Sequence, residues 1–345
     1  STRCGRLSRL LAAVTAVCDA LGVEAKQELN PAQQEVLAEL GAPKEQRPRF
    51  DAMLRHELQR ALEDGLEPML PMLDLREGEK PGDSMFVSKY ALGQVLGCER
   101  KFVVEQAEPF EWKVPIARGT IAHKAIELSV HWRRELDPMT LVDEAMARRG
   151  EGIDPLADWL QTISETERAE LRGTTNDLVL KFLECFPPLK PAWYPSTETS
   201  LRVEIHDRFV LSGRCDLSIG VADGDRAGKV LVDLKTGSTS LHHRNDLRFY
   251  ALLDAIRIGT PPRRLATYYL DQGRFQVEDV TEDLLFSTVA RVVDGVERML
   301  MLSSGQRDAT TATGPACRWC PVRHDCDDGK RHLADDEDTT LGAGW

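Results

Sequence analysis

The sequence predicts an α/β fold in which a central mixed β-sheet is flanked by helices, with a helical region preceding it at the N-terminus. Two observations support this. Short runs with strand-like alternation are separated by turn signals and interleaved with longer segments of helical periodicity. In contrast, the first 75 residues show helical patterns alone. We predict strands at 201–211, 213–220, 229–235, 264–271 and 274–280, and helices near 120–135, 175–186, 241–259 and 281–300.

Composition divides the chain into three parts. We expect residues 1–80 to form a helical accessory region. The stretch REGEKPGDS at 76–84, which is charged and rich in glycine and proline, fits a linker or loop at its end. A second module spans residues 81–330 and contains all the predicted strands. Residues 331–345 carry the acidic run DDED with few apolar residues, so we expect a disordered tail.

Charge and hydropathy exclude several classes of protein. A net charge of −12 argues against a protein that coats nucleic acid through bulk positive charge, although local basic grooves remain compatible with it. Since the chain has no apolar run long enough to cross a bilayer, we expect no membrane association. The opening residues combine arginines with an apolar patch, as signal peptides do, but their apolar positions recur at helical spacing, which favours an amphipathic helix. Eight cysteines without an export signal favour the cytoplasm.

The stretch LVDLKTG places two charged residues within a strand that should be buried. Side chains alternate along a strand, so Asp233 and Lys235 share one face. On the preceding strand Asp216 lies on the polar face, and a hairpin would bring it close to Asp233. Two neighbouring carboxylates repel unless a cation lies between them, and oxygen ligands suit Mg²⁺ or Mn²⁺. An ammonium beside a metal-bound water would orient or help deprotonate it, so this layout predicts hydrolysis.

GRCDLSIG followed by VLVDLKTG resembles the D…(D/E)xK signature of the PD-(D/E)XK nuclease superfamily, and the wider arrangement is similar to its RecB-like exonuclease branch. The resemblance covers roughly residues 84–326 and implies a restriction-endonuclease-like core. It also implies that His123 in RGTIAHKAIE, Asp216 and Asp233 hold the Mg²⁺ or Mn²⁺ ion and that Lys235 is the catalytic lysine. Taken singly, each has a structural alternative: a solvated strand edge for the DxK pair and an ordinary helix histidine for His123.

The sequence departs from this branch on the helix after the DxK strand. The branch carries a QxxxY motif there, whose glutamine and tyrosine position the substrate, whereas DLRFY has Asp246 and keeps Tyr250. Both are candidate substrate-binding residues, with Arg248 between them, although Asp246 and Tyr250 would equally suit the polar edge of an amphipathic helix. Glu204 is a further acid on the first strand, for which a solvated position is favoured.

The segment CRWCPVRHDC supplies Cys317, Cys320 and Cys326 near the end of the module. Closely spaced cysteines of this kind can share one metal centre. By the same family resemblance, Cys98 is the fourth ligand of a [4Fe-4S] cluster that closes the module. From spacing alone, Zn²⁺ bound by the same four cysteines, or by three with His324, remains the alternative.

The sequence thus predicts a metal-dependent deoxyribonuclease, with exonuclease action expected, in repair, recombination or defence. Its DNA would be single-stranded or have single-stranded ends, and a helicase or other repair protein is a candidate partner. Candidate groups for gripping and stacking DNA are Arg100, Lys101, Arg118, Arg244, Arg248, Tyr250 and Trp319. The alternatives are a degenerate nuclease fold that only binds DNA or a helicase, and a zinc-stabilised interaction module.

Overall fold

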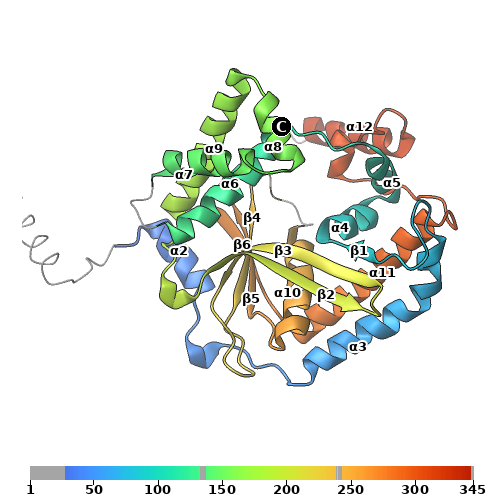
Figure 1. The fold of residues 1–345 in the computed structure, drawn as a ribbon, viewed down its shortest axis with the longest axis horizontal. Coiled ribbons are helices and arrows are strands. Elements are labelled where there is room, and N and C mark those ends of the chain that lie inside the picture. The colour runs from blue at the N-terminus through green and yellow to red at the C-terminus, as the bar shows by residue number, and fades with distance from the viewer. Residues whose placement is uncertain (1–27, 133–136, 238, 240–242, 343–345) are drawn as a thin grey trace, which may run out of the picture.

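A six-stranded mixed sheet runs through the centre of the computed structural model, as Figure 1 shows. The structure describes residues 28–132, 137–237, 239 and 243–342. The strands are β1 (Met85–Val87), β2 (Ser196–Ile205), β3 (Phe209–Ile219), β4 (Val230–Lys235), β5 (Arg264–Tyr269) and β6 (Arg274–Asp279). Their order is β1-β3-β4-β5-β6, with β2 paired to β3. This arrangement confirms the predicted fold class.

β3 organises the sheet because three strands pair with it. β2 runs antiparallel along nearly its whole length. On the opposite edge, β1 pairs in parallel with residues 209–211 and β4 pairs antiparallel with residues 217–219. Residues 212–216 of β3 therefore lie between these two pairings, and the sheet is split there. Side chains from outside the sheet can enter this split, which positions the candidate site.

Helices cover both faces of the sheet (Figure 1). They are α2 (Pro31–Leu40), α3 (Leu54–Leu66), α4 (Lys89–Gly97), α5 (Glu99–Ala107), α6 (Val114–His131), α7 (Pro138–Gly150), α8 (Pro155–Thr162), α9 (Glu165–Cys185), α10 (His243–Ile258), α11 (Glu282–Ser303) and α12 (Asp327–Gly342). One core joins α3, α4, α10 and α11 to the sheet. A second joins α2, α6 and α9 to the other face, and a third lies among α6 to α9.

The described part of the N-terminal region shares its core with the rest of the chain. Leu54, Leu58, Leu62 and Leu66 form the apolar stripe of α3 and are at most 1% exposed. This stripe packs against α10 and α11. Packing therefore continues across the predicted boundary at residue 80. The amphipathic helix predicted at the start of the chain lies outside the described residues.

The position of the first hairpin differs from the prediction. The sequence predicted one strand over 201–211 and a turn at Ser212–Arg214, but β3 runs unbroken from Phe209 to Ile219. The turn instead lies at His206 and Asp207, whose φ angles are 52° and 54°. Both residues adopt the left-handed conformation that tight hairpin turns require. The turn contains no glycine, and the glycine that suggested a turn, Gly213, lies within β3 for a different reason.

The C-terminal segment also differs from the prediction. The expected disordered tail continues α12 as far as Gly342. Asp327 and Asp328 stand in the first turn of this helix, where negative charge is favourable to the helix dipole. None of the helices in the described ranges is both long enough and apolar enough to span a membrane.

Candidate active site

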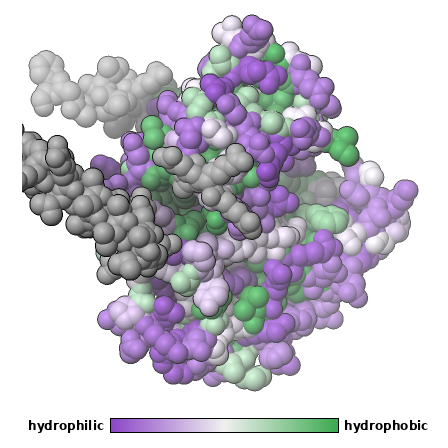
Figure 2. Space-filling view, turned by 60° about the vertical axis from the view of Figure 1, so that its left-hand side comes forward, coloured by the Kyte–Doolittle hydropathy of each residue, from purple (hydrophilic) through white to green (hydrophobic). Residues whose placement is uncertain are grey.

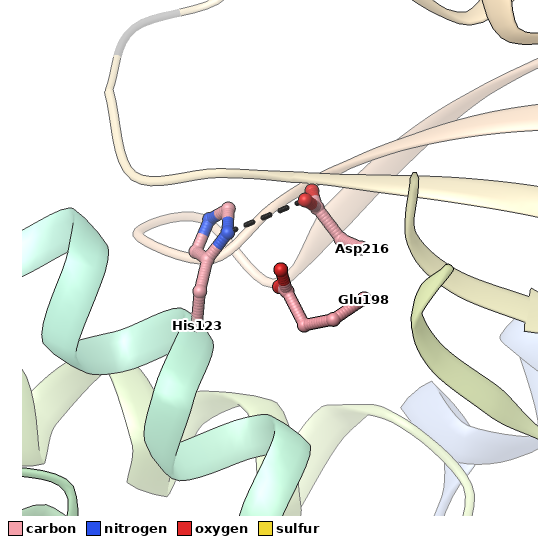
Figure 3. A group of neighbouring side chains, drawn as sticks. All are labelled: His123, Glu198 and Asp216. Atoms are coloured by element: carbon pink, nitrogen blue, oxygen red, sulfur yellow. Dashed lines mark ion pairs between the residues drawn. The ribbon is translucent and has the colours of Figure 1, made fainter. Parts of the chain in front are cut away.

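Three side chains from separate elements meet beside the split in the sheet: His123 from α6, Glu198 from β2 and Asp216 from β3. One ligand atom from each lies within 4.8 Å of the others. Figure 3 shows all three pointing toward one space. His123 Nδ1 lies 3.4 Å from Asp216 Oδ1. The structure therefore brings two predicted metal ligands together and adds a carboxylate that the sequence reasoning missed.

Glu198 was missed because the predicted strand began at Leu201, whereas β2 begins at Ser196. The pairs Thr197–Leu217 and Thr199–Cys215 place Glu198 directly opposite Asp216. Its φ of 50° is the left-handed conformation, which is rare for a glutamate inside a strand and is found where a site imposes it. The acid considered from sequence, Glu204, is exposed and pairs with Arg202 instead.

The electrostatics of this group suit a bound cation. Burial and the Asp216 carboxylate raise the pKa of Glu198. Burial disfavours the His123 imidazolium, but the carboxylates of Asp216 and Asp233 outweigh it and raise the pKa of His123. Both shifts report excess negative charge in a partly dry space. Two carboxylates and an imidazole are donors that Mg²⁺ or Mn²⁺ accepts, so the residues fit such an ion.

Asp233 lies next to this group but makes different contacts. Its side chain is 1% exposed, with Oδ1 2.7 Å from Lys89 Nζ and Oδ2 2.9 Å from Lys235 Nζ. The two lysines outweigh burial and lower its pKa. Asp216 remains close by, since its Oδ2 accepts a hydrogen bond of 2.7 Å from the Leu234 backbone N–H on β4. The predicted ligand Asp233 thus stands outside the group of three, with two ammonium groups against it.

Lys235 is held between two carboxylates. Its Nζ lies 2.8 Å from Asp246 Oδ2 on α10 as well as 2.9 Å from Asp233. Burial disfavours the ammonium, but Asp233 outweighs that effect and raises the pKa of Lys235. The aspartate that replaces the glutamine of the QxxxY motif is thus an ion-pair partner of the candidate catalytic lysine. In this state Lys235 is a cation at neutral pH and not a base.

Lys89, the first residue of α4, is a second cation in the split that the sequence reasoning did not single out. Its Nζ lies 4.7 Å above the ring of Tyr250. A Cβ on Gly213 would lie 2.4 Å from Cε1 of Tyr250, so the ring can rest on β3 only because residue 213 has no side chain. Tyr250 is 3% exposed and burial raises its pKa to about 12. Its ring is therefore closed to base stacking in this structure and serves to position Lys89.

Most of the remaining substrate-binding candidates are already bonded to other groups of the chain. Arg248 makes a two-contact ion pair with Glu278 on β6, so its charge is already neutralised. Arg118 donates to the Thr236 carbonyl and lies 3.5 Å from Asp271. Arg100 and Lys101 bond to Asp325 and Glu105. Trp319 is 76% exposed and remains accessible for stacking.

The four predicted cluster cysteines lie where α5 meets the C-terminal segment. Cys98 precedes α5, and the other three lie between Pro315 and the start of α12 at Asp327. The sulfurs of Cys317 and Cys326 both lie within 4 Å of the position a Cβ on Gly329 would take. Burial together with Cys98 and Cys317 raises the pKa of Cys320. Among the described residues, however, no three cysteine sulfurs lie within 4.8 Å of one another.

Glu99 holds α5 and the C-terminal segment together. The residue is 1% exposed, and its carboxylate accepts hydrogen bonds from Arg307 and from both the N–H and the hydroxyl of Thr310. Arg100 adds bonds to the Thr310 and Asp325 carbonyls. Because a buried carboxylate is costly unless it is paired, these contacts fix the C-terminal segment beside Cys98.

Residues 87–327 match a family model that describes the PD-(D/E)XK nuclease superfamily. This match covers more than half of the chain, and it includes every residue of the site. The chain belongs to the PD-(D/E)XK nuclease superfamily. Its members are nucleases that use divalent metals, so a phosphodiester hydrolase with an acidic and histidine metal site is the activity the family indicates.

Matches among solved structures are more distant. A Eubacterium rectale protein described as a candidate exonuclease is 10% identical, with 71% of this chain and 87% of that chain covered at a TM-score of 0.41. Scheffersomyces stipitis Rai1, in complex with (3'-NADP)⁺ and calcium, is 10% identical, with 74% and 71% covered at a TM-score of 0.22. No curated protein is similar enough in sequence to match the chain.

Proposed function

We propose that this nuclease is a metal-dependent deoxyribonuclease of the RecB-like exonuclease branch, acting on DNA that is single-stranded or has single-stranded ends. The observation that carries the proposal is the convergence of His123, Glu198 and Asp216 beside a lysine-paired Asp233. This activity suits a role in repair, recombination or defence in the cytoplasm. A helicase or another repair protein is the partner that such a role would require.

Mg²⁺ or Mn²⁺ would be held by His123, Glu198 and Asp216, with Asp233 as a neighbouring carboxylate that is paired with Lys89 and Lys235. A bound divalent ion supplies a polarised phosphate oxygen and a water of lowered pKa. The chain supplies the rest. Because Asp216 is held by the Leu234 N–H, its free oxygen keeps a set direction toward His123 and Glu198.

Lys235 acts as an electrostatic group in this proposal. Its raised pKa keeps it protonated, so it stabilises negative charge developing on the phosphate and does not remove a proton from water. Two of its three N–H donors face Asp233 and Asp246 at 2.9 and 2.8 Å, so one remains for a phosphate oxygen, and moving away from Asp246 would free a second. Lys89 keeps Asp233 paired during this exchange.

End-labelled single-stranded and duplex DNA, incubated with Mn²⁺ or Mg²⁺, tests the proposal. We expect the wild type to shorten the DNA from its ends. In Asp216→Asn the rate of cleavage should fall by roughly 100-fold or more, because the change removes a metal-binding carboxylate and the contact that orients His123. Glu204→Gln is the matched control, because Glu204 lies on β2 yet pairs with Arg202 away from the group. DNA binding without cleavage in the wild type would instead support a degenerate nuclease fold. The ion pair between Lys235 and Asp246 would then explain the lost activity, because it holds the candidate catalytic lysine.

We also propose that the module, residues 81–330, is closed by a [4Fe-4S] cluster on Cys98, Cys317, Cys320 and Cys326. Each thiolate of such a cluster binds a different iron, so the sulfurs stand farther apart than around one Zn²⁺ ion. The proposal rests on the spacing of these cysteines in the sequence and on the contacts of Glu99, which hold the C-terminal segment beside Cys98. Among the described residues the structure itself gathers no three of their sulfurs within 4.8 Å.

Iron and acid-labile sulfide analysis of anaerobically purified protein distinguishes the two metals. We expect iron and sulfide in the wild type and in Cys185→Ser, whose cysteine lies on α9, and their loss in Cys98→Ser. If the analysis finds one equivalent of zinc and no iron, the four cysteines bind Zn²⁺ and the cluster proposal is wrong.

A further inference from the structure

A cavity of about 310 Å³ lies at the end of the sheet where β3 stops and β4 begins. Its walls come from α2, from the segment following α9 and from the strand ends, including Leu40, Phe186, Ile219 and Val230. This volume falls within the range of small-molecule sites. Figure 2 shows the side of the molecule that lies to the left in Figure 1: where grey residues do not cover it, it is largely hydrophilic with apolar residues scattered among the polar ones.

The cavity is separate from the catalytic group. None of His123, Glu198 and Asp216 is among the residues that line it. On β3, Ile219 lines the cavity and Asp216 stands three residues earlier, about 10 Å along the strand and turned to the opposite face of the sheet. Val230 also lines the cavity and belongs to the core beneath α2 and α9. A ligand in the cavity would therefore leave the candidate active site accessible.

Arg263 lines the cavity and is only 7% exposed. Its Nη2 donates to the Leu40 carbonyl, but its Nε is buried without a hydrogen-bond partner. No carboxylate forms an ion pair with it in the described ranges, because Asp279 makes both its contacts with Arg264. Burial and the nearby Arg264 lower the pKa of Arg263 to about 10. A buried, unpaired guanidinium is costly, and an anionic ligand would remove that cost.

A second arginine and two aromatic side chains complete the lining. Arg47 donates through Nε to the Ala42 carbonyl, and its Nη1 lies 3.0 Å from where a Cβ on Gly228 would stand. Trp193 and Tyr194 also line the cavity. Two guanidinium groups beside flat rings are suited to a phosphate joined to a planar base.

We propose that this cavity binds a nucleoside monophosphate, with the phosphate on Arg263 and Arg47 and the base against Trp193. The choice of a nucleotide over another aromatic anion rests on the proposed function, since exonuclease hydrolysis of DNA releases this class of molecule. The cavity would then sense the product of the reaction at a position apart from the catalytic group.

Thermal shift and calorimetric titration with dAMP in EDTA test the proposal, because removing divalent metal suppresses binding at the catalytic group. We expect dAMP to raise the Tm of the wild type and to bind roughly tenfold to a hundredfold more weakly to Arg263→Met. Arg257→Met, which changes an exposed arginine on α10, is the matched control and should bind as the wild type does. Trp193→Ala should also weaken binding, so the result does not depend on the Arg263 variant folding.

Deoxyadenosine and inorganic phosphate, used as separate probes, distinguish the sources of binding. We expect each to bind more weakly than dAMP. Inorganic phosphate binding as tightly as dAMP would overturn the nucleotide assignment, and unchanged dAMP binding in both variants would overturn the site. Binding that depends on Arg263 in a protein that cleaves no DNA would retain the cavity and reject the nuclease proposal, so the two failures are distinguishable.

Discussion

The candidate site has two halves, each with two carboxylates: a lysine-paired half around Asp233 and a group formed by His123, Glu198 and Asp216. The two halves balance the charge of their carboxylates in different ways. Asp233 and Asp246 are neutralised within the chain by Lys89 and Lys235. The group of His123, Glu198 and Asp216 contains two carboxylates and an imidazole, and burial and repulsion raise the pKa of Glu198. Two largely buried lysines neutralise one half, whereas the other sets His123 and the exposed Arg214 against two carboxylates and would gain more from a bound cation.

This difference assigns the two halves separate tasks. The carboxylates of the other group have the exposed Arg214, 3.6 Å from Glu198 Oε2, and the His123 imidazole beside Asp216, and a divalent ion would add further favourable charge. A buried acid between two ammonium groups is already paired, and breaking that pairing is costly. We therefore expect changes in the lysine-paired half to affect folding strongly, and changes in the other half to affect chiefly the response to metal.

The largest effect is expected for Lys89→Met. It removes the partner 2.7 Å from Asp233 Oδ1 and leaves a carboxylate that is 1% exposed with one cation. Breaking a buried pair in this way costs about 3 kcal/mol or more in the free energy of unfolding, measurable by urea denaturation. Lys113→Met is the control, since Lys113 is 66% exposed in its pair with Glu111 and should change stability little. Equal stabilities for the two variants would contradict the assignment of Lys89.

An intermediate effect is expected for Gly213→Ala. The added Cβ would stand 2.4 Å from Cε1 of Tyr250, so the ring and the lysine above it must move. We expect a loss of about 1–3 kcal/mol in stability together with reduced cleavage. Gly93→Ala is the matched control: nothing lies within 4 Å of its added Cβ, and alanine favours the helix α4 in which it lies. Equal melting temperatures for Gly213→Ala and Gly93→Ala would contradict the role of Gly213 in seating Tyr250 beneath Lys89.

The smallest effect on stability is expected for Glu198→Gln, and its sign depends on pH and metal. Because the folded-state pKa of Glu198 is raised, its contribution to stability is present in acid and is lost as pH rises through that pKa. In EDTA the variant should therefore melt at or slightly above the wild-type Tm near neutral pH and lose this advantage in acid. Added Mn²⁺ should raise the Tm of the wild type more than that of the variant. A Mn²⁺ response that Glu198→Gln leaves intact would remove Glu198 from the metal group.

Local patterns were sufficient for the strands and helices around the DxK motif. Alternation in VLVDLK and helical periodicity in the following segment both correspond to observed elements, β4 and α10. The turn at His206 and Asp207 was not predictable in this way, because it has no glycine or proline and owes its conformation to the strands that it joins. Gly213 misled for the same reason, since it serves a contact with Tyr250 from a distant helix.

The sequence by itself determined the fold class, which follows from periodicity, and the family, whose motifs lie within single elements; the resemblance to that family also paired His123 with Asp216, which the structure brings together. Only the tertiary structure decided which charges neutralise one another. Glu198 joins the metal group through strand register, and Lys89 reaches Asp233 across 144 positions of the chain. Pairing energies depend on distance and burial, which chain separation does not specify until the sheet and its helices have packed.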